Sequence, residues 1–344
     1  MMTPGIVQNF RTNGVISTCK AYGGGLINTT FLTETDSARY ILQKINKAVF
    51  RDPPALMENI VKVTRHLHKA ADSQTLTLVP CLDDGMWHVD GQGEYWRMYD
   101  YIEHSQYLEH TISPAILRES GLAFGGFINE MAAFDANALS ETIPDFHNTP
   151  KRYAQLHDAI AADTQGRVKH AAREIEFALA REGFAGLLTE LQASGDMPTR
   201  VTHNDTKLSN VLFRQNSGKA LCVIDLDTVM PGLAVTDFGD GIRSGASTAA
   251  EDERNIDNVN FSLSLYHAFR EGFLTACSTL NACEIAHLPH GAKMMTLECG
   301  VRFLTDYLSG DVYFRTTRPE QNLDRCRTQF KLVSDMEYHW DKRS

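Results

Sequence analysis

Short runs in which apolar and polar residues alternate fill the first hundred residues, and such alternation predicts β-strands. Strands are expected around Tyr22 and over residues 29–32, 39–45, 76–79 and 95–102. Between the third and fourth of these runs, apolar residues recur at helical spacing, which predicts one helix over residues 54–71. The N-terminal part of the chain is therefore expected to be a small sheet with a single helix.

The pattern changes after about Glu103, where apolar residues recur three and four positions apart, as in amphipathic helices. Helices are predicted over residues 116–134, 150–162 and 173–193, and again throughout 262–336. A short hairpin, with strands at 211–213 and 220–224, interrupts this helical region. The whole pattern predicts an α+β fold of two lobes, a small β-rich one (residues 1–102) and a larger, mainly helical one (residues 103–344). A cleft between two such lobes is the default place for a ligand.

Composition narrows the possible partners of this 344-residue chain. The formal net charge of -10 argues against a nucleic-acid groove, which needs a basic surface. No apolar run approaches the length of a membrane span, and the N-terminus lacks the pattern of a signal peptide, so a cytoplasmic protein is expected. Seven cysteines without a Cys-x-x-Cys pair favour reduced thiols over disulfides or zinc. A monomer or weak dimer with a small-molecule substrate fits these observations.

The most specific pattern is His-Asn-Asp-Thr-Lys-Leu-Ser-Asn at residues 203–210, followed by the hairpin and then Asp225. Phosphoryl transfer requires a carboxylate that meets the attacking hydroxyl, and oxygen ligands that hold Mg²⁺ on the phosphates of ATP. Asp205 is the candidate base, and Asn210 and Asp225 are the candidate metal ligands. A chance turn with a capping Asn210 is the competing interpretation, but four residue types at fixed spacing disfavour it.

Neighbouring residues leave alternatives open. Lys207 is expected to reach the γ-phosphate, although a solvated loop lysine would look the same in sequence. Asp227 should share a face with Asp225 on an extended chain, as a second ligand, a substrate contact or a partner in a structural salt bridge. Asp237 begins an Asp-Phe-Gly triplet but does not follow a strand, so a structural role is expected, such as capping a helix that starts near Asp240. His287 and His290 flank Pro289 in what reads as a turn.

With these residues assembled, the chain resembles the aminoglycoside phosphotransferase and choline kinase superfamily, and within it the N-acetylhexosamine 1-kinases. The resemblance spans nearly the whole chain and is carried by residues 25–30, 39–43, 96–104, 200–210, 224–232, 237–240 and 298–311. It implies a protein-kinase-like fold, ATP and Mg²⁺ as cofactors, and phosphorylation of the C1 hydroxyl of GlcNAc or GalNAc. It also implies that Arg302 and Tyr313 contact the sugar, and that Asn28 does so from the glycine turn.

The same resemblance assigns the nucleotide to the N-terminal lobe. Gly24 and Gly25 are expected to form a phosphate lid, and Gln43 stands where protein kinases have a strand lysine. Residues 99–103 are expected to connect the lobes, with backbone amide and carbonyl groups facing adenine. Tyr101 or Ile102 is expected to pack on the purine, although both could equally be ordinary core residues. Leu26 replaces a histidine that is frequent in the family, which leaves the preferred sugar open.

Two rival functions remain at this stage. A kinase of the same fold could act on another hexose, an amino alcohol or an aminoglycoside, the last of which requires a strongly acidic site. A pseudokinase scaffold is disfavoured because Asp205, Asn210 and Asp225 are all present.

Overall fold

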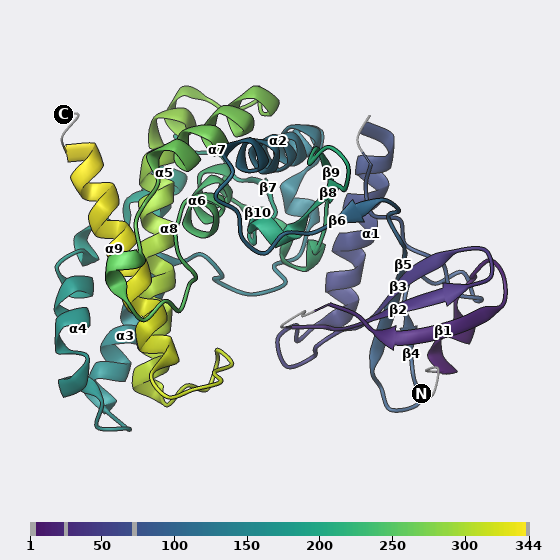
Figure 1. The fold of residues 1–344 in the computed structure, drawn as a ribbon, viewed down its shortest axis with the longest axis horizontal. Coiled ribbons are helices and arrows are strands. Elements are labelled where there is room, and N and C mark those ends of the chain that lie inside the picture. Colours follow the sequence, from purple (N-terminus) through teal and green to yellow (C-terminus); the bar gives the residue numbers. More distant parts are fainter. Residues whose placement is uncertain (1–4, 24–26, 71–73, 342–344) are drawn as a thin grey trace.

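The structure is a computed structural model that describes residues 5–23, 27–70 and 74–341. Figure 1 shows an antiparallel sheet on one side, a larger helical part on the other and helix α1 (Pro53–Ala70) between them. This arrangement is the protein-kinase-like, two-part α+β fold that the hydrophobic pattern and the resemblance predict. The boundary at residue 102 stays a prediction.

The N-terminal sheet has five strands in the order β1-β2-β3-β5-β4. Its strands are β1 (Ile16–Ala21), β2 (Thr29–Thr35), β3 (Arg39–Lys44), β4 (His88–Val89) and β5 (Tyr95–Asp100). The strand expected at residues 76–79 is reduced to a single bridge between Leu78 and Tyr99. The pairing cannot continue because Pro80 follows and has no N–H to donate.

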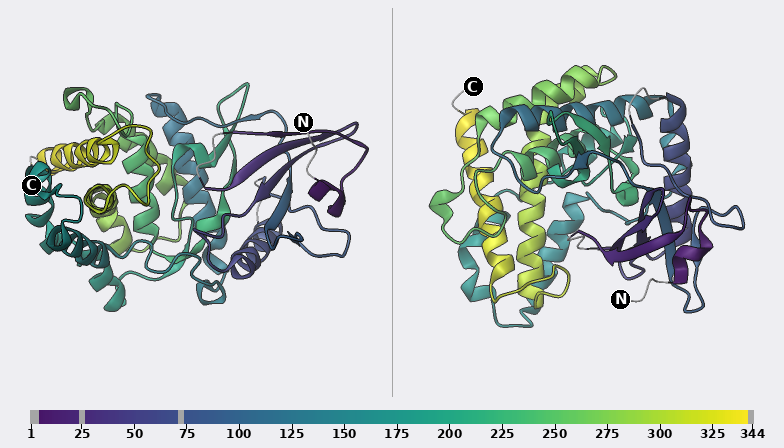
Figure 2. Two further views of the ribbon diagram at one scale, coloured as in Figure 1. Left: turned by 90° about the horizontal axis from the view of Figure 1, so that it is seen from below. Right: turned by 45° about the vertical axis from the view of Figure 1, so that its right-hand side comes forward.

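The helical part also contains two small sheets, one pairing β7 with β10 and one with the order β6-β8-β9. Their strands are β6 (Ser105–Gln106), β7 (Arg200–Thr202), β8 (Val211–Arg214), β9 (Ala220–Val223) and β10 (Met230–Gly232). The helices are α2 (Pro114–Glu130), α3 (Thr149–Ala162), α4 (Ala172–Leu179), α5 (Leu187–Ala193), α6 (Ala234–Gly245), α7 (Leu263–Ala276), α8 (Ala282–Ser309) and α9 (Gln321–Asp341). Figure 2 shows α8 and α9 side by side at the end remote from the N-terminal sheet.

Two expectations about the helices are wrong. The helix expected over residues 173–193 is divided into α4 and α5, because Gly183 and Gly186 weaken the segment between them. Pro289 does not make a turn: α8 runs through it, and His287 and His290 lie on this helix. Helix α8 is 28 residues long, so packing along the rest of its length offsets the one hydrogen bond that a proline removes.

Glycine allows a close contact between the helices α2 and α7. A methyl group added at Gly121 or Gly125 would collide with backbone atoms of α7, and one added at Gly272 would collide with α2. The two helices therefore approach at backbone distance, which fixes α2 beneath the small sheet that carries β8 and β9. A continuous core of buried apolar side chains joins α1, α2, α6 and α7.

All seven cysteines lie within the described residues, and each is a free thiol, as expected. Across the described ranges of the chain, no helix combines the length and apolar character needed to cross a membrane.

Candidate active site

The loop between β7 and β8, residues 203–210, holds the candidate base Asp205. Asn204, just before it, adopts a left-handed backbone with φ +64°, a conformation that asparagine tolerates better than most residues. Its side-chain amide donates to the carbonyl oxygens of Thr202 (3.2 Å) and Thr228 (2.9 Å). The turn before Asp205 is thus set by local hydrogen bonds.

Two carboxylates of α6 hold the backbone of this loop. The Asp237 carboxylate accepts from the N–H groups of His203 and Asn204, both at 2.7 Å. Asp240 accepts from the N–H of Thr206 at 2.8 Å. Asp237 lies in the first turn of α6, so its expected structural role is correct, but its expected capping of a helix near Asp240 is wrong.

Backbone contacts bring the ends of the motif together. The N–H of Ile224 donates to the carbonyl of Asn210 at 2.9 Å, and His203 Nε2 lies 2.9 Å from the carbonyl of Ile224. Because Asp225 follows Ile224 directly, its side chain starts beside the loop that carries Asp205. Positions 205, 210 and 225 therefore lie near one another, and the charges of Lys207 and Asp205 act on Asp225; the roles of base and metal ligand stay predictions.

Asp205 is paired within its own loop. Its Oδ2 lies 2.7 Å from Nζ of Lys207 and accepts from Nδ2 of Asn210 at 2.9 Å. Burial acts to raise the pKa of Asp205, but the neighbouring Lys207 and the other donors outweigh it and the pKa is lowered. The carboxylate is thus held ionised, as a base must be.

Asp225 has a different environment at the end of β9. Its backbone is left-handed (φ 62°) and residues 226–228 form a single 3-10 turn, so the expectation that Asp227 shares its face on an extended chain is wrong. Burial, and then the negative charge of Asp227, raise the pKa of Asp225 to about 7. A carboxylate crowded by like charges favours a cation.

Asp227 links the helical part to the N-terminal sheet. One of its carboxylate oxygens lies 2.5 Å from the Arg97 guanidinium as an ion pair, and the other accepts from Nδ2 of Asn28 at 2.6 Å. The side chains are 1% exposed for Arg97 and 4% for Asp227. Of the alternatives for Asp227, the salt bridge is the one present here, and Asn28 contacts Asp227 from the sheet side.

Gln43 contacts this ion pair and does not replace a lysine charge. Strand register places Gln43 opposite Arg97, and its carbonyl oxygen accepts from Nε of Arg97 at 3.0 Å. Burial acts to lower the pKa of Arg97, but Asp227 outweighs it and the pKa is raised. The buried positive charge near Asp225 is therefore Arg97 on β5. The position that corresponds to the strand lysine of protein kinases is Gln43, on the adjacent strand β3.

Arg302 of α8 and Tyr313, in the turn after this helix, lie together. The Arg302 guanidinium is within 5.7 Å of the ring centroids of Phe146, Tyr313 and Phe314. Tyr313 is 60% exposed, so its hydroxyl can meet a ligand. Asp306 holds the turn before it by accepting from the backbone N–H of Tyr313 at 2.8 Å.

Of the residues expected to contact the nucleotide, Tyr101 and Ile102 lie within the part of the chain that the structure describes. Tyr101 stacks under the Arg39 guanidinium at 4.1 Å, and its backbone N–H already donates to the carbonyl of Arg39. That amide is therefore not free to face a purine, as a connection between lobes would require. Ile102 is buried in the main core. Gly24, Gly25 and Leu26 lie outside the described residues.

The residues present fit Mg²⁺ that arrives with a nucleotide. Both hydrogen bonds made by the side chain of Asn210 use its amide nitrogen, which leaves its oxygen for a cation beside Asp225. Within the described ranges, no group of three or more His, Cys, Asp or Glu side chains is placed to hold a metal ion by itself. Phosphate oxygens would therefore complete the shell, which is how Mg²⁺ is commonly bound.

Sequence reasoning missed Arg97, His147 and the role of Asp240. Arg97 stands among aromatic and apolar residues of a central strand, and a charge at such a position signals a buried partner. His147, which contacts the carbonyl of Asn204, follows no periodic pattern, and its local sequence carries no comparable signal.

Comparison with known proteins agrees with this geometry. Residues 18–271 match the model of the "Phosphotransferase enzyme family". The fold is similar to that of a microcompartment-associated aminopropanol kinase, at 14% identity and a TM-score of 0.63 over 98% of this chain and 96% of that one. It is also similar to a spectinomycin phosphotransferase in complex with ADP and spectinomycin (14%, TM-score 0.59, 96% and 94%).

A third similar structure is a choline kinase from Cryptosporidium parvum Iowa II, at 13% identity and a TM-score of 0.59 over 95% of this chain and 90% of that one. At these identities the structures show the fold alone, whereas the family match covers most of the chain. The chain belongs to the phosphotransferase enzyme family.

Proposed function

We propose that this protein transfers the γ-phosphoryl group of ATP to the anomeric C1 hydroxyl of an N-acetylhexosamine, GlcNAc or GalNAc. The observation that carries the proposal is the convergence of an ionised Asp205 with Asn210 and Asp225, through contacts of Asn210 and Ile224. The choice of a sugar is supported by Arg302 and Tyr313, where a guanidinium fork and a phenol stand beside aromatic faces. Hydroxyl-rich rings are bound by directional hydrogen bonds and by flat apolar contacts.

In this mechanism Asp205 orients the acceptor hydroxyl and takes its proton as the oxygen attacks. Lys207, paired with Asp205 at 2.7 Å, keeps the carboxylate ionised until the acceptor arrives and is then placed to meet the transferred phosphoryl group. Asp225 and Asn210 would hold Mg²⁺, which when bound neutralises charge on the phosphates. Arg97 pairs with Asp227, and this pairing holds β5 of the nucleotide side against the metal-binding turn.

The charges near the expected acceptor favour a sugar over a polycation. Arg152 and Arg302 face each other closely enough that burial first, and then Arg302, lower the pKa of Arg152. Two guanidinium groups disfavour an aminoglycoside, a polycation that needs a negative environment. An uncharged acceptor with many hydroxyl groups meets no such penalty.

The test is product analysis with ATP, Mg²⁺ and a panel of acceptors: GlcNAc, GalNAc, glucose, galactose, choline, aminopropanol and an aminoglycoside. We expect ADP release with the N-acetylhexosamines, and NMR coupling between phosphorus and H1 of the product. Phosphorus coupled to another proton would contradict the C1 assignment. Turnover confined to the amines would overturn the sugar assignment while leaving the kinase assignment intact.

A further inference from the structure

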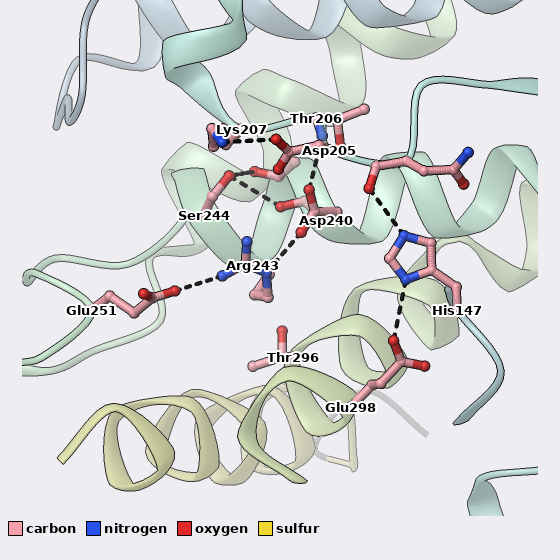
Figure 3. Close-up of polar contacts among 12 residues, drawn as sticks. His147, Asp205, Thr206, Lys207, Asp240, Arg243, Ser244, Glu251, Thr296 and Glu298 are labelled. Atoms are coloured by element: carbon pink, nitrogen blue, oxygen red, sulfur yellow. Dashed lines mark hydrogen bonds and ion pairs between the residues drawn. The ribbon is translucent and has the colours of Figure 1, made fainter. Parts of the chain in front are cut away.

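His147 lies just before α3 and touches the loop of the candidate base from outside that loop. Its Nε2 is 3.0 Å from the carbonyl oxygen of Asn204, and its Nδ1 is 3.1 Å from Oε1 of Glu298 on α8 (Figure 3). The side chains are 11% exposed for His147 and 1% for Glu298. Figure 3 shows the imidazole between the carbonyl and the carboxylate, with one ring nitrogen directed at each.

The partners decide how many protons this ring carries. A backbone carbonyl only accepts, and so does an ionised carboxylate. A neutral imidazole has one N–H and would leave one nitrogen facing an acceptor without a proton between them, whereas an imidazolium donates to both. The second oxygen of Glu298 accepts from the hydroxyl of Thr149 at 2.6 Å, which fits an ionised carboxylate.

His203 provides a contrast within the same site. Its Nε2 meets the carbonyl of Ile224, but its Nδ1 accepts from the backbone N–H of Asp205 at 3.3 Å. That ring has one acceptor and one donor as partners, as a neutral imidazole requires, and burial lowers its pKa. The two histidines of the site are therefore expected to carry different charges.

We propose that His147 is a positioning residue that works as an imidazolium: paired with Glu298, it holds the carbonyl of Asn204 and thereby sets the position of the base Asp205. The inference rests on the proposed transfer reaction for its kinetic test, but not for its spectroscopic one. The N–H groups of residues 203, 204 and 206 are held by α6, and His147 holds a carbonyl of the same turn.

The contacts of His147 with Glu298 and with the carbonyl of Asn204 also connect Asp205 to the expected acceptor contact, Arg302. Glu298 and Arg302 are one turn apart on α8, and Phe146, next to His147, packs against the Arg302 guanidinium. A shift at the acceptor side is therefore transmitted to the carbonyl that precedes Asp205. Misplacing a reacting group by about 1 Å can cost about 100-fold in rate, so a tie at this point matters for turnover.

The charges around the ring come from three elements. Glu298 approaches from α8, and Asp237 and Asp240 approach from α6, while Arg302 of α8 and Arg152 of α3 lie near Glu298. Burial acts to lower the pKa of His147, but Glu298 and then Asp240 outweigh it, and the pKa is raised. The charged form is thus the one that the surroundings favour.

The kinetic test compares His147→Gln and Glu298→Gln with a control, His157→Gln, which removes an exposed histidine paired with Glu182. We expect kcat to fall about 10- to 100-fold in His147→Gln, with KM for ATP unchanged and no change in the control. In the wild type, kcat should decline on the alkaline side as the imidazolium loses its proton. This decline should move to lower pH in Glu298→Gln and be absent from His147→Gln.

The spectroscopic test uses the wild-type protein labelled with ¹⁵N at histidine, and needs no activity. At a pH above the ordinary titration range of histidine, we expect both ring nitrogens of His147 to be protonated and His203 to carry one proton. A single protonated nitrogen on His147 would overturn the proposal, even if His147→Gln proved too unstable to assay. Wild-type kcat in a folded His147→Gln would overturn it as well, whatever the acceptor turns out to be.

Discussion

Removing Arg97 should show how much the stability of the molecule depends on the described ion pair between β5 and the turn of residues 225–228. In Arg97→Met, the Asp227 carboxylate stays buried with Asn28 as its remaining donor, and the carbonyl of Gln43 loses its partner. Breaking a buried ion pair by removing one member costs about 3–5 kcal/mol, because the other charge is left uncompensated. With Arg97 at 1% exposure, solvent offers Asp227 little relief, so we expect a loss of free energy of unfolding in that range.

The assay is urea unfolding followed by two signals. With Trp340 of α9 replaced by phenylalanine in all variants, tryptophan fluorescence reports on the N-terminal part through Trp87 and Trp96, the neighbour of Arg97 in β5, and far-UV circular dichroism reports mainly on the helices. The double variant Arg97→Met/Asp227→Asn should recover most of the loss, since it removes the orphaned charge. A cost below about 1 kcal/mol for Arg97→Met, or a double variant no more stable than the single one, would refute this account of the ion pair.

Three further predictions concern Asp205, the contact between α2 and α7, and the pair of His147 and Glu298. Asp205→Asn should lower kcat by about 100- to 10,000-fold with KM for ATP nearly unchanged, and near-normal turnover would refute its role as base. Gly125→Ala should lower the free energy of unfolding by about 1–3 kcal/mol by separating α2 from α7, whereas its neighbour Gly126→Ala, which has room for a methyl group, should be neutral or slightly stabilising. The melting temperature lost in His147→Gln should be largest between the ordinary pKa values of Glu298 (4.5) and His147 (6.5). The pKa of Glu298 is lowered in the folded protein, so the loss should shrink as the pH falls from 4.5 through that lowered pKa. The pKa of His147 is raised, so the loss should also shrink as the pH rises from 6.5 through that raised pKa. A loss that does not depend on pH would contradict the ion pair.

The parts of the site that sequence could predict are those carried by one short segment. The spacing of Asp205, Lys207 and Asn210 is a local property of residues 203–210, and the hairpin that returns to Asp225 is indicated by two short apolar runs on either side of a turn at residues 215–218. Most helices were predicted for the same reason, since periodicity is local.

The missed features depend on contacts between distant segments. Arg97 and Asp227 are 130 positions apart and His147 and Glu298 are 151 apart, so neither pair leaves a spacing to detect. The error over Asp227 has the same origin, because its direction depends on the left-handed backbone of Asp225 and not on strand alternation. The turn wrongly expected at Pro289 shows that tertiary packing can override a strong local signal.

The base and the expected acceptor contacts are held by different means, and this separation bears on how the fold accommodates different acceptors. The backbone of residues 203–206 is held by buried groups of α6 and by His147, whereas Tyr313 stands on an exposed turn held by Asp306. Substitutions at Tyr313 can therefore alter which hydroxyl is presented without moving Asp205. Arg302 is different, because it contacts Phe146 beside His147, and a change there should alter both acceptor binding and turnover. Comparing KM and kcat for Tyr313→Phe and Arg302→Lys would separate the two cases: the first should change KM for the acceptor alone, and the second should change both.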